Sequence, residues 1–117
     1  KEGTELDADA LNEVERATHY FNENYNQNIC IKDYAAERHM SDCWFNRTFK
    51  KVTKVTPIQY IISLRIVSAI NLLENTDHNI KQISKMVGYD DEYYFSRLFK
   101  KQTGQSPTAY RKMLESK

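Results

Sequence analysis

The sequence predicts an all-α fold of seven helices, in which two helix-turn-helix units are joined by one long connector helix that both share. The 117 residues include only three glycines and two prolines, and no run of alternating apolar and polar residues marks a strand. Residues 45–60 and 95–110 align without a gap, so one supersecondary unit occurs twice. Eight pairs in this alignment are identical: Phe45 and Phe95, Arg47 and Arg97, Phe49 and Phe99, Lys50 and Lys100, Lys51 and Lys101, Thr53 and Thr103, Pro57 and Pro107, and Tyr60 and Tyr110.

The first part of the chain is predicted to form an acidic lead helix followed by a helix-turn-helix. Asp7 is the expected N-cap of a helix over residues 8–23. A short helix over residues 31–38 follows, then a turn at His39-Met40 and a helix over residues 42–52 that Ser41 caps. The side chains expected to face inward are Leu11, Val14, Ala17, Thr18, Phe21, Ile31, Tyr34, Ala35, Phe45, Thr48, Phe49 and Val52.

The connector is predicted over residues 57–74, opened by Thr56-Pro57. Its apolar side chains fall on two faces, so it is expected to be buried on two sides. The larger face contains Ile58, Ile61, Ile62, Ile66, Ala69, Leu72 and Leu73, and the second contains Tyr60, Leu64, Val67 and Ile70. Arg65 lies within the larger face, and we expect it to be structural, with an acidic or carbonyl partner.

The second unit is predicted to repeat the first with a turn that is one residue longer. Asn79 caps a short helix over residues 80–86, and Gly88-Tyr89-Asp90 form the turn. A helix with Asp91 at its N-terminus runs to Thr103, and Ser106-Pro107 opens a last helix over residues 107–114. Ile83, Met86, Val87, Phe95, Leu98 and Phe99 are expected to face inward. The predicted domain is 1–117, divided into an acidic lead helix (1–25), a first unit (26–55), the connector (56–75) and a second unit (76–117).

The charges are divided along the chain. Residues 1–25 carry seven acidic and two basic side chains, a balance of −5, whereas residues 26–117 carry fifteen basic and nine acidic ones, a balance of +6. Basic character in the part that holds the repeat suggests a polyanionic partner. The sequence contains no nucleophile elbow, no phosphate loop and no pair of carboxylates in an apolar setting, so an enzyme is the wrong class and no cofactor is expected.

The cysteines and the apolar stretches point to a cytoplasmic protein. Cys30 and Cys43 form no disulfide framework and are interpreted as reduced thiols. A metal site from these two and His39 would lack a fourth ligand at a usual spacing. Polar residues interrupt the longest apolar stretch, residues 58–73, so no membrane span is predicted. Because the chain starts at Lys1 without a methionine, we interpret it as a fragment of something longer.

Residues 31–112 resemble the DNA-binding domain of the AraC/XylS family of bacterial transcription regulators. The resemblance is densest over residues 87–101, and it continues at Gly104, Ser106-Pro107 and Tyr110-Arg111. It implies two helix-turn-helix units that place their second helices in successive major grooves of double-stranded DNA. It further implies RNA polymerase as a partner and a sensor or dimerisation domain on the N-terminal side. The acidic lead helix either packs against that domain or completes the first unit.

The candidate DNA-binding residues lie on the side of each second helix that remains once the apolar stripe is turned inward. The resemblance assigns base contact to this side, which also contains Asp42. The base-reading candidates on it are Cys43, Asn46, Arg47, Glu92, Tyr93, Ser96 and Arg97. Arginine forks suit guanine, and the Asn46 amide suits adenine. Lysines and helix N-termini suit phosphates, and these candidates are Lys50, Lys51, Thr56, Lys100, Lys101 and Ser106.

Several alternatives accompany this interpretation. A helical module that binds a protein through its basic faces is the rival function, and the dependence of DNA affinity on salt separates the two. Trp44 and Tyr94 are expected to pack against the preceding short helices rather than to stack on bases. Lys54 occupies the slot in which the second copy has Gly104, and Tyr93 stands where the family commonly has serine.

Overall fold

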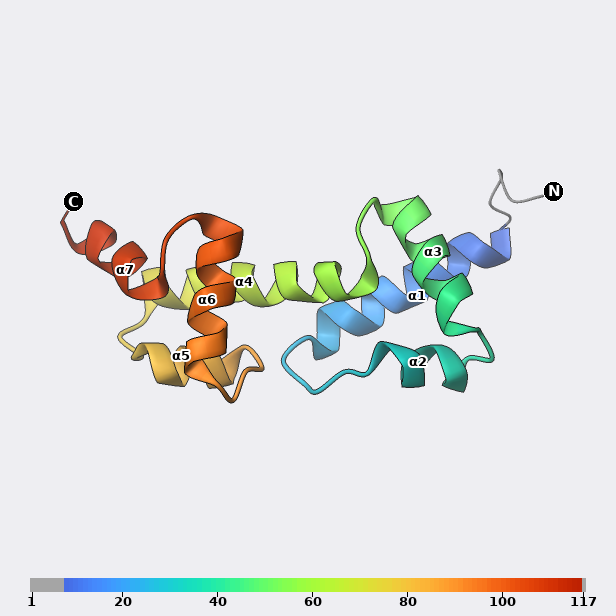
Figure 1. The fold of residues 1–117 in the computed structure, drawn as a ribbon, viewed down its shortest axis with the longest axis horizontal. Coiled ribbons are helices and arrows are strands. Elements are labelled where there is room, and N and C mark those ends of the chain that lie inside the picture. The colour runs from blue at the N-terminus through green and yellow to red at the C-terminus, as the bar shows by residue number, and fades with distance from the viewer. Residues whose placement is uncertain (1–7, 117) are drawn as a thin grey trace. The chain divides into compact units, whose positions relative to one another are not determined.

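The computed structural model describes residues 8–116, which form seven α-helices and no strand (Figure 1). The helices are α1 (Ala8–Asn24), α2 (Ile31–Glu37), α3 (Asp42–Thr53), α4 (Pro57–Asn75), α5 (Ile80–Met86), α6 (Glu92–Thr103) and α7 (Pro107–Glu115). The all-α, seven-helix prediction is confirmed, and the helix ends lie within a residue or two of those expected. The N-cap expected at Asp7 lies outside the described residues.

The chain divides into two compact units, Lys1–Ile62 and Ser63–Lys117. The helix α4 supplies its first turns to unit 1 and the remaining turns to unit 2. Within the described residues no single helix is long and apolar enough to cross a membrane; only α3 and α4 taken together, with a bend of 56° between them, meet that test.

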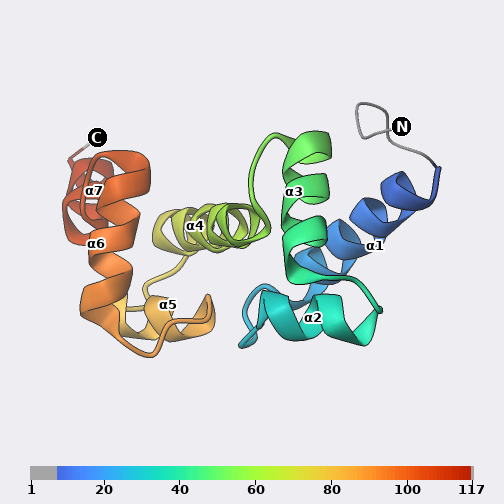
Figure 2. The same cartoon turned by 45° about the vertical axis from the view of Figure 1, so that its right-hand side comes forward.

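Unit 1 is built around an aromatic cluster to which α1 contributes. Phe21 of α1 contacts the rings of Tyr34, Phe49 and Tyr60 at centroid distances of 5.6, 5.8 and 6.2 Å. Figure 2 shows α2 crossing the lower end of α3, with α1 behind them. The Tyr60 hydroxyl donates to Asn22 Oδ1 at 2.8 Å. The acidic helix α1 therefore completes the first unit.

An ion pair adds a second tie between α1 and the helix-turn-helix. Arg38, which follows α2, donates from Nε and Nη2 to the two carboxylate oxygens of Glu13 at 2.7 and 3.2 Å. This two-point hydrogen bonding holds the pKa of the Glu13 carboxyl below its usual value of 4.5. The pair connects the side of α1 to the turn that precedes α3.

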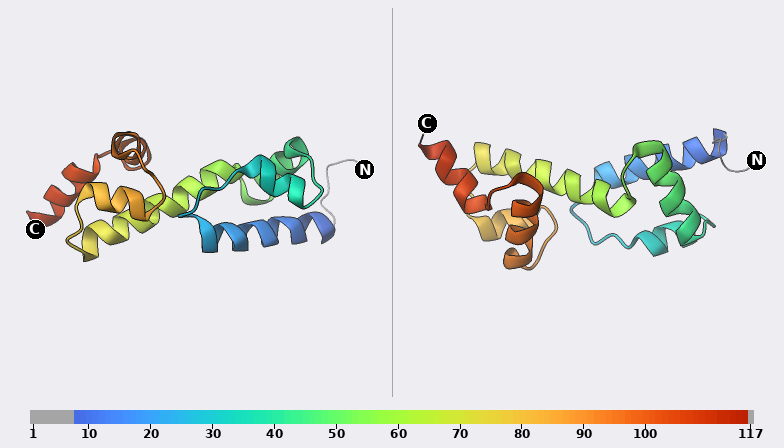
Figure 3. Two further views of the ribbon diagram at one scale, coloured as in Figure 1. Left: turned by 90° about the horizontal axis from the view of Figure 1, so that it is seen from below. Right: turned by 45° about the horizontal axis from the view of Figure 1, so that its top comes forward.

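Unit 2 repeats the arrangement, with the second part of α4 in the place that α1 takes in unit 1. Phe95 and Phe99 of α6 are fully buried, and Tyr110 of α7 stands against Phe99 at 6.0 Å, as Tyr60 stands against Phe49 at 5.6 Å. Both views of Figure 3 show α5, α6 and α7 gathered around the end of α4.

The repeat extends to individual hydrogen bonds. The Thr53 hydroxyl donates to the carbonyls of Phe49 and Val55, both at 2.9 Å. Thr103 makes the same two bonds to Phe99 and Gln105, at 2.9 and 3.0 Å. The caps are matched in part. Ser41 and Asp91 each accept a hydrogen bond from an amide in the first turn of α3 and α6, and Thr56 and Ser106 do so for α4 and α7. Asn79 caps α5 in the same way, whereas Cys30, its counterpart before α2, makes no side-chain cap.

Four side chains that were expected to face inward are exposed, and these predictions were wrong: Leu11, Ile58, Val67 and Met86. Val67 is 65% exposed because it shares an outer stripe of α4 with the polar Ser63 and Asn71, one turn away on either side. The buried side chains of α4 include Ile61 and Leu73 of the larger face. Of the second face, Tyr60, Leu64 and Ile70 are half-buried, so this face is covered less completely than the first.

On α5 a polar side chain is buried, where Met86 was expected to face inward. Ser84 is fully buried between Ile83 and Val87. Its hydroxyl donates to the Tyr89 carbonyl at 2.8 Å, and the Tyr89 amide donates to the Ser84 carbonyl at 2.9 Å. These two hydrogen bonds compensate for the burial of the Ser84 hydroxyl, and they fix the turn that leads to α6.

Candidate nucleic-acid interface

The helix α3 presents a polar side because its apolar side is anchored in unit 1. His39 takes a left-handed conformation with φ of 63° in the turn, and the Ser41 hydroxyl caps α3 by accepting from the Trp44 amide at 3.0 Å. Phe45 and Phe49 are fully buried. The opposite side of the helix, including the predicted Cys43, Arg47, Lys50 and Lys51, is exposed, and the predicted Asn46 is half-buried beside it.

Two of the predicted base-reading side chains on α3 are engaged by residues one turn earlier. Asn46 Nδ2 donates to both the carbonyl and the Oδ1 of Asp42, each at 2.8 Å. Arg47 Nη2 donates to the Cys43 Sγ at 3.0 Å. Arg47 keeps its other N–H groups for a base, but the amide nitrogen that Asn46 would need for the two-point contact with adenine is already used.

The helix α6 presents the corresponding side in unit 2. Asp91 caps it by accepting from the amides of Tyr93 and Tyr94 at 2.9 and 3.2 Å. Tyr93 is 74% exposed. Arg97, Lys100 and Lys101 are exposed, and Glu92 and Ser96 are half-buried at the edge of the same side. The structure thus leaves every predicted base-reading residue at the surface of its own unit.

The turn before α6 is held by Arg65 of α4. The Arg65 guanidinium lies over the Tyr89 ring, 4.7 Å from its centroid. A Cβ added at Gly88, where φ is 111°, would lie 3.0 Å from the Arg65 Cζ, so this position suits only glycine. Burial raises the pKa of Tyr89, while the hydrogen bond with Arg65 opposes that change. The structural role predicted for Arg65 is confirmed, with an aromatic partner that the sequence did not predict.

The predicted phosphate contacts at the helix N-termini, Thr56 and Ser106, differ in their surroundings. Thr56 forms a capping box, in which its hydroxyl accepts from the Gln59 amide at 3.2 Å and its own amide donates to Gln59 Oε1 at 2.9 Å. Ser106 accepts from the Ala109 amide at 3.1 Å, and alanine offers no side chain for the reciprocal bond. Each hydroxyl still has its proton to donate.

The comparisons with known proteins identify this arrangement. A family model described as a helix-turn-helix domain matches residues 34–113. The MmsAB operon regulatory protein of Pseudomonas aeruginosa is 39% identical over 111 residues, which is 95% of this chain and 34% of that protein. The chain belongs to the AraC/XylS family of transcription regulators, as its DNA-binding domain.

Solved structures agree with this assignment. The C-terminal domain of AraT, a response regulator from Geobacillus stearothermophilus, aligns with a TM-score of 0.82 and 32% identity over 86% of this chain and 84% of that one. The DNA-binding domain of AdpA, solved in complex with a target DNA, aligns with a TM-score of 0.81 and 26% identity over 88% of this chain and 93% of that one. This AraC/XylS chain spans about a third of the length of the first two curated relatives that it matches.

Two aromatic side chains border the candidate interface of this AraC/XylS domain. Trp44 is partly exposed beside the turn residues His39, Met40 and Ser41. Tyr94 is also partly exposed, and its ring meets the edge of Tyr89 at 5.7 Å. Both therefore lie beside the turns that follow the short helices, and their expected packing against those helices stays a prediction.

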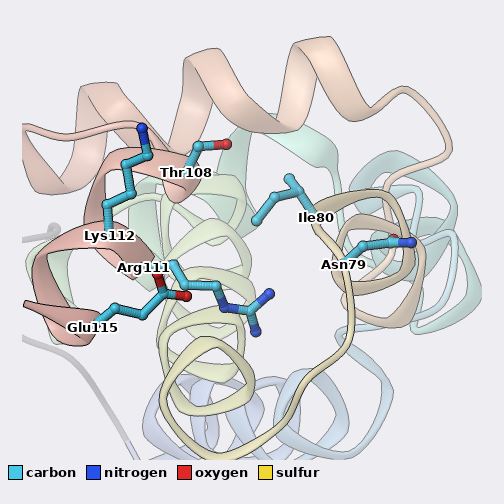
Figure 4. Close-up of a pocket in the computed structure, with 6 residues that line it drawn as sticks. All are labelled: Asn79, Ile80, Thr108, Arg111, Lys112 and Glu115. Carbon is cyan, nitrogen blue, oxygen red and sulfur yellow. The ribbon is translucent and has the colours of Figure 1, made fainter.

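Unit 2 of the AraC/XylS domain also contains a separate hollow, lined in part by Arg111, which has a structural role. Its volume is about 290 Å³, and its lining residues, shown in Figure 4, are Asn79, Ile80, Thr108, Arg111, Lys112 and Glu115. Arg111 donates to the carbonyls of Thr76 at 3.0 Å, Leu73 at 3.4 Å and also His78. Its guanidinium thus caps the C-terminal end of α4. In the described residues no group of three or more His, Cys, Asp or Glu side chains could hold a metal ion.

Proposed function

We propose that this AraC/XylS domain binds a specific double-stranded DNA site by inserting α3 and α6 into successive major grooves. The observation that carries the proposal is the placement of Arg47 and Arg97. Both are exposed, both lie at the same position of the repeat, and both stand on the side of their helix opposite two buried phenylalanines. A planar guanidinium at such a position is suited to the O6 and N7 atoms of guanine.

The neighbouring side chains add further base contacts. Glu92 can accept a hydrogen bond from the amino group of cytosine, and Ser96 can donate to or accept from several bases. Tyr93 is 74% exposed, so its side chain is more accessible to a base than those of the half-buried Glu92 and Ser96. On α3 we assign base contact to Cys43, Asn46 and Arg47.

The lysines at the C-terminal ends of the two reading helices bind phosphates in this proposal. Lys50 and Lys51 occupy the last turn of α3, and Lys100 and Lys101 occupy the last turn of α6. All four are exposed. The hydroxyls of Thr56 and Ser106 donate to further phosphate oxygens, since both stand at the N-terminus of a helix, where anions are favoured.

We further propose that residues 1–117 form one domain of a longer, non-enzymatic regulator. The supporting observation is that the matched curated relatives are regulators about three times as long as the matched part. We assign a sensor or dimerisation domain to the N-terminal side, RNA polymerase as a protein partner, and the bacterial cytoplasm as the compartment.

Selection from a random duplex library tests the DNA-reading proposal, with the wild type and the variants Arg47→Ala, Arg97→Ala and Lys100→Ala. Each arginine variant should lose about 1–3 kcal/mol on the preferred site and relax preference at one base step, with the two steps about 10 base pairs apart. Lys100→Ala should weaken binding to all sequences about equally and reduce the slope of log affinity against log salt by about one unit.

Other outcomes would redirect the assignment. If Arg97→Ala abolished one preference and Arg47→Ala none, only unit 2 would read sequence. If neither variant changed a preferred base, the reading faces would be assigned wrongly. If the wild type bound random duplex DNA without a steep loss of affinity in salt, a module that binds protein through its basic faces would be the better description.

A further inference from the structure

We infer that Asp42 sets the base preference of unit 1 by occupying both N–H groups of the Asn46 amide, which leaves only its oxygen, a hydrogen-bond acceptor, to contact a base. The inference rests on the proposed function, because it names the class of base that α3 selects. A side-chain amide has two N–H groups and one oxygen. Asp42 accepts from the Asn46 nitrogen through its carbonyl and its Oδ1, each at 2.8 Å, so both N–H groups have partners.

The assignment of the amide nitrogen follows from chemistry. Both atoms that approach it are acceptors, and a carbonyl or carboxylate oxygen cannot donate to an amide oxygen. The Asn46 Oδ1 is therefore the atom that remains for a base. In the major groove an acceptor alone selects an exocyclic amino group, which adenine carries at N6 and cytosine at N4, and it disfavours guanine and thymine, whose O6 and O4 are themselves acceptors.

This expectation differs from the usual behaviour of asparagine on a reading helix. A free amide contacts adenine at two points, because its nitrogen donates to N7 while its oxygen accepts from N6, and it rejects cytosine, which lacks an equivalent acceptor. With the nitrogen held by Asp42, adenine and cytosine become nearly equivalent. Asp42 is thus a positioning residue that broadens the preference of Asn46 from one base to two.

The second unit supplies a matched control within the same chain. The positions that correspond to Asp42 and Asn46 are Glu92 and Ser96, and a serine has no amide to restrain. Removal of the Glu92 carboxylate should therefore change the preference only at the step that α6 reads, where Glu92 is itself a proposed base contact, and leave the base preference of unit 1 unchanged. Asp42 is exposed and lies outside the core, so its replacement by alanine should leave the fold intact.

The experiment is selection from a random duplex library with the wild type, Asn46→Ala, Asp42→Ala and Glu92→Ala, each checked by thermal unfolding. The wild type should enrich adenine and cytosine about equally at one step, and Asn46→Ala should abolish that preference. Asp42→Ala frees one N–H of Asn46 for adenine N7, so adenine should exceed cytosine by about tenfold at this step. Glu92→Ala should retain the wild-type ratio there.

Three results would overturn the inference while the proposed function stands: an adenine-only preference in the wild type, no effect of Asn46→Ala, or an adenine-to-cytosine ratio that Asp42→Ala does not change. Loss of all sequence preference in the wild type would instead refute the proposed function. The restraint itself can be tested without DNA, by NMR of the Asn46 side-chain amide protons. The proton that donates to Asp42 Oδ1 should shift when Asp42 is replaced by alanine, because the other proton keeps its main-chain carbonyl partner. Unchanged shifts of both protons would refute the restraint.

Discussion

The backbone at Lys54 allows a direct test of how the two units end their reading helices. Lys54 is the C-cap of α3 with φ of 75° and ψ of 0°, and Gly104 is the C-cap of α6 with φ of 92° and ψ of −9°. The slot expected from the repeat is therefore left-handed in both units. A residue with a Cβ is strained in this conformation by about 1–2 kcal/mol. Lysine at position 54 should accordingly lower the stability of unit 1.

The substitution Lys54→Gly should raise the free energy of unfolding. The relief of strain is about 1–2 kcal/mol, and the greater freedom of glycine in the unfolded chain opposes it by about 0.4–1 kcal/mol. The difference is a net gain of about 0–1.6 kcal/mol, and its midpoint of about 0.8 kcal/mol corresponds to a rise in Tm of about 2–5 °C. The side chain itself contributes little, because its only described hydrogen bond, from Nζ to the Lys51 carbonyl, is long at 3.4 Å.

Two control variants separate the backbone from the lost charge. Lys54→Ala removes the same charge but keeps a Cβ in the left-handed conformation, so it should be less stable than Lys54→Gly by about 1 kcal/mol. Gly104→Ala should lose a similar amount in unit 2, where a Cβ would meet no atom within 4 Å and the cost comes from the backbone alone. Urea unfolding measures all three variants. Equal stability of the glycine and alanine variants at position 54 would refute the reasoning.

Two further predictions concern α4 and the ion pair of unit 1. In urea unfolding, Ile61→Ala should lower the free energy of unfolding by about 2–5 kcal/mol because Ile61 is buried. Val67→Ala should change it by less than about 0.5 kcal/mol. Equal losses would show that Val67 lies on a buried face after all. Glu13→Gln should destabilise the protein at neutral pH. The lowered pKa of Glu13 means that its contribution is present above the unfolded pKa and is lost as pH falls through the folded pKa, so wild type and variant should converge in acid, below the usual value of 4.5. Parallel stability curves would contradict this.

Local chemistry explains why the helices could be predicted from the sequence. Ser41, Asn79, Asp91 and Ser106 each cap the helix that was expected to begin after them. A cap acts within four residues, so its signal survives without knowledge of the tertiary fold. The repeat then supplied the long-range arrangement, because two copies of one stretch must form two similar units.

Burial could be predicted only in part, because a helical wheel shows which residues share a face and not which face another element covers. Val67 and Ile61 are both apolar and lie on the same helix, yet one is exposed and the other is buried. Ser84 shows the reverse case, since it is polar and buried. Its partner is the main chain of the turn, and main-chain partners leave no trace in the residue types.

The candidate interface was predictable as a surface but not as a set of hydrogen bonds. Turning the apolar stripe of each helix inward correctly predicted that Arg47 and Arg97 are exposed. The spacing of Asp42 and Asn46 permits a contact one turn apart, and the spacing of Glu92 and Ser96 permits another. The side-chain rotamers decide whether such a contact forms, and the base preference depends on that decision.

The two units reach the same fold with different backbone strain. Unit 1 uses non-glycine residues at both left-handed positions that flank α3, His39 and Lys54, whereas unit 2 uses glycine at both. Each such residue costs about 1–2 kcal/mol, so the first reading helix is bounded by strain that the second lacks. Unit 1 has two compensating features in α1: Phe21 in the aromatic cluster and the Glu13 ion pair beside the first turn. The acidic helix is therefore part of what keeps α3 in place, and it cannot be treated as a separable leader to the helix-turn-helix.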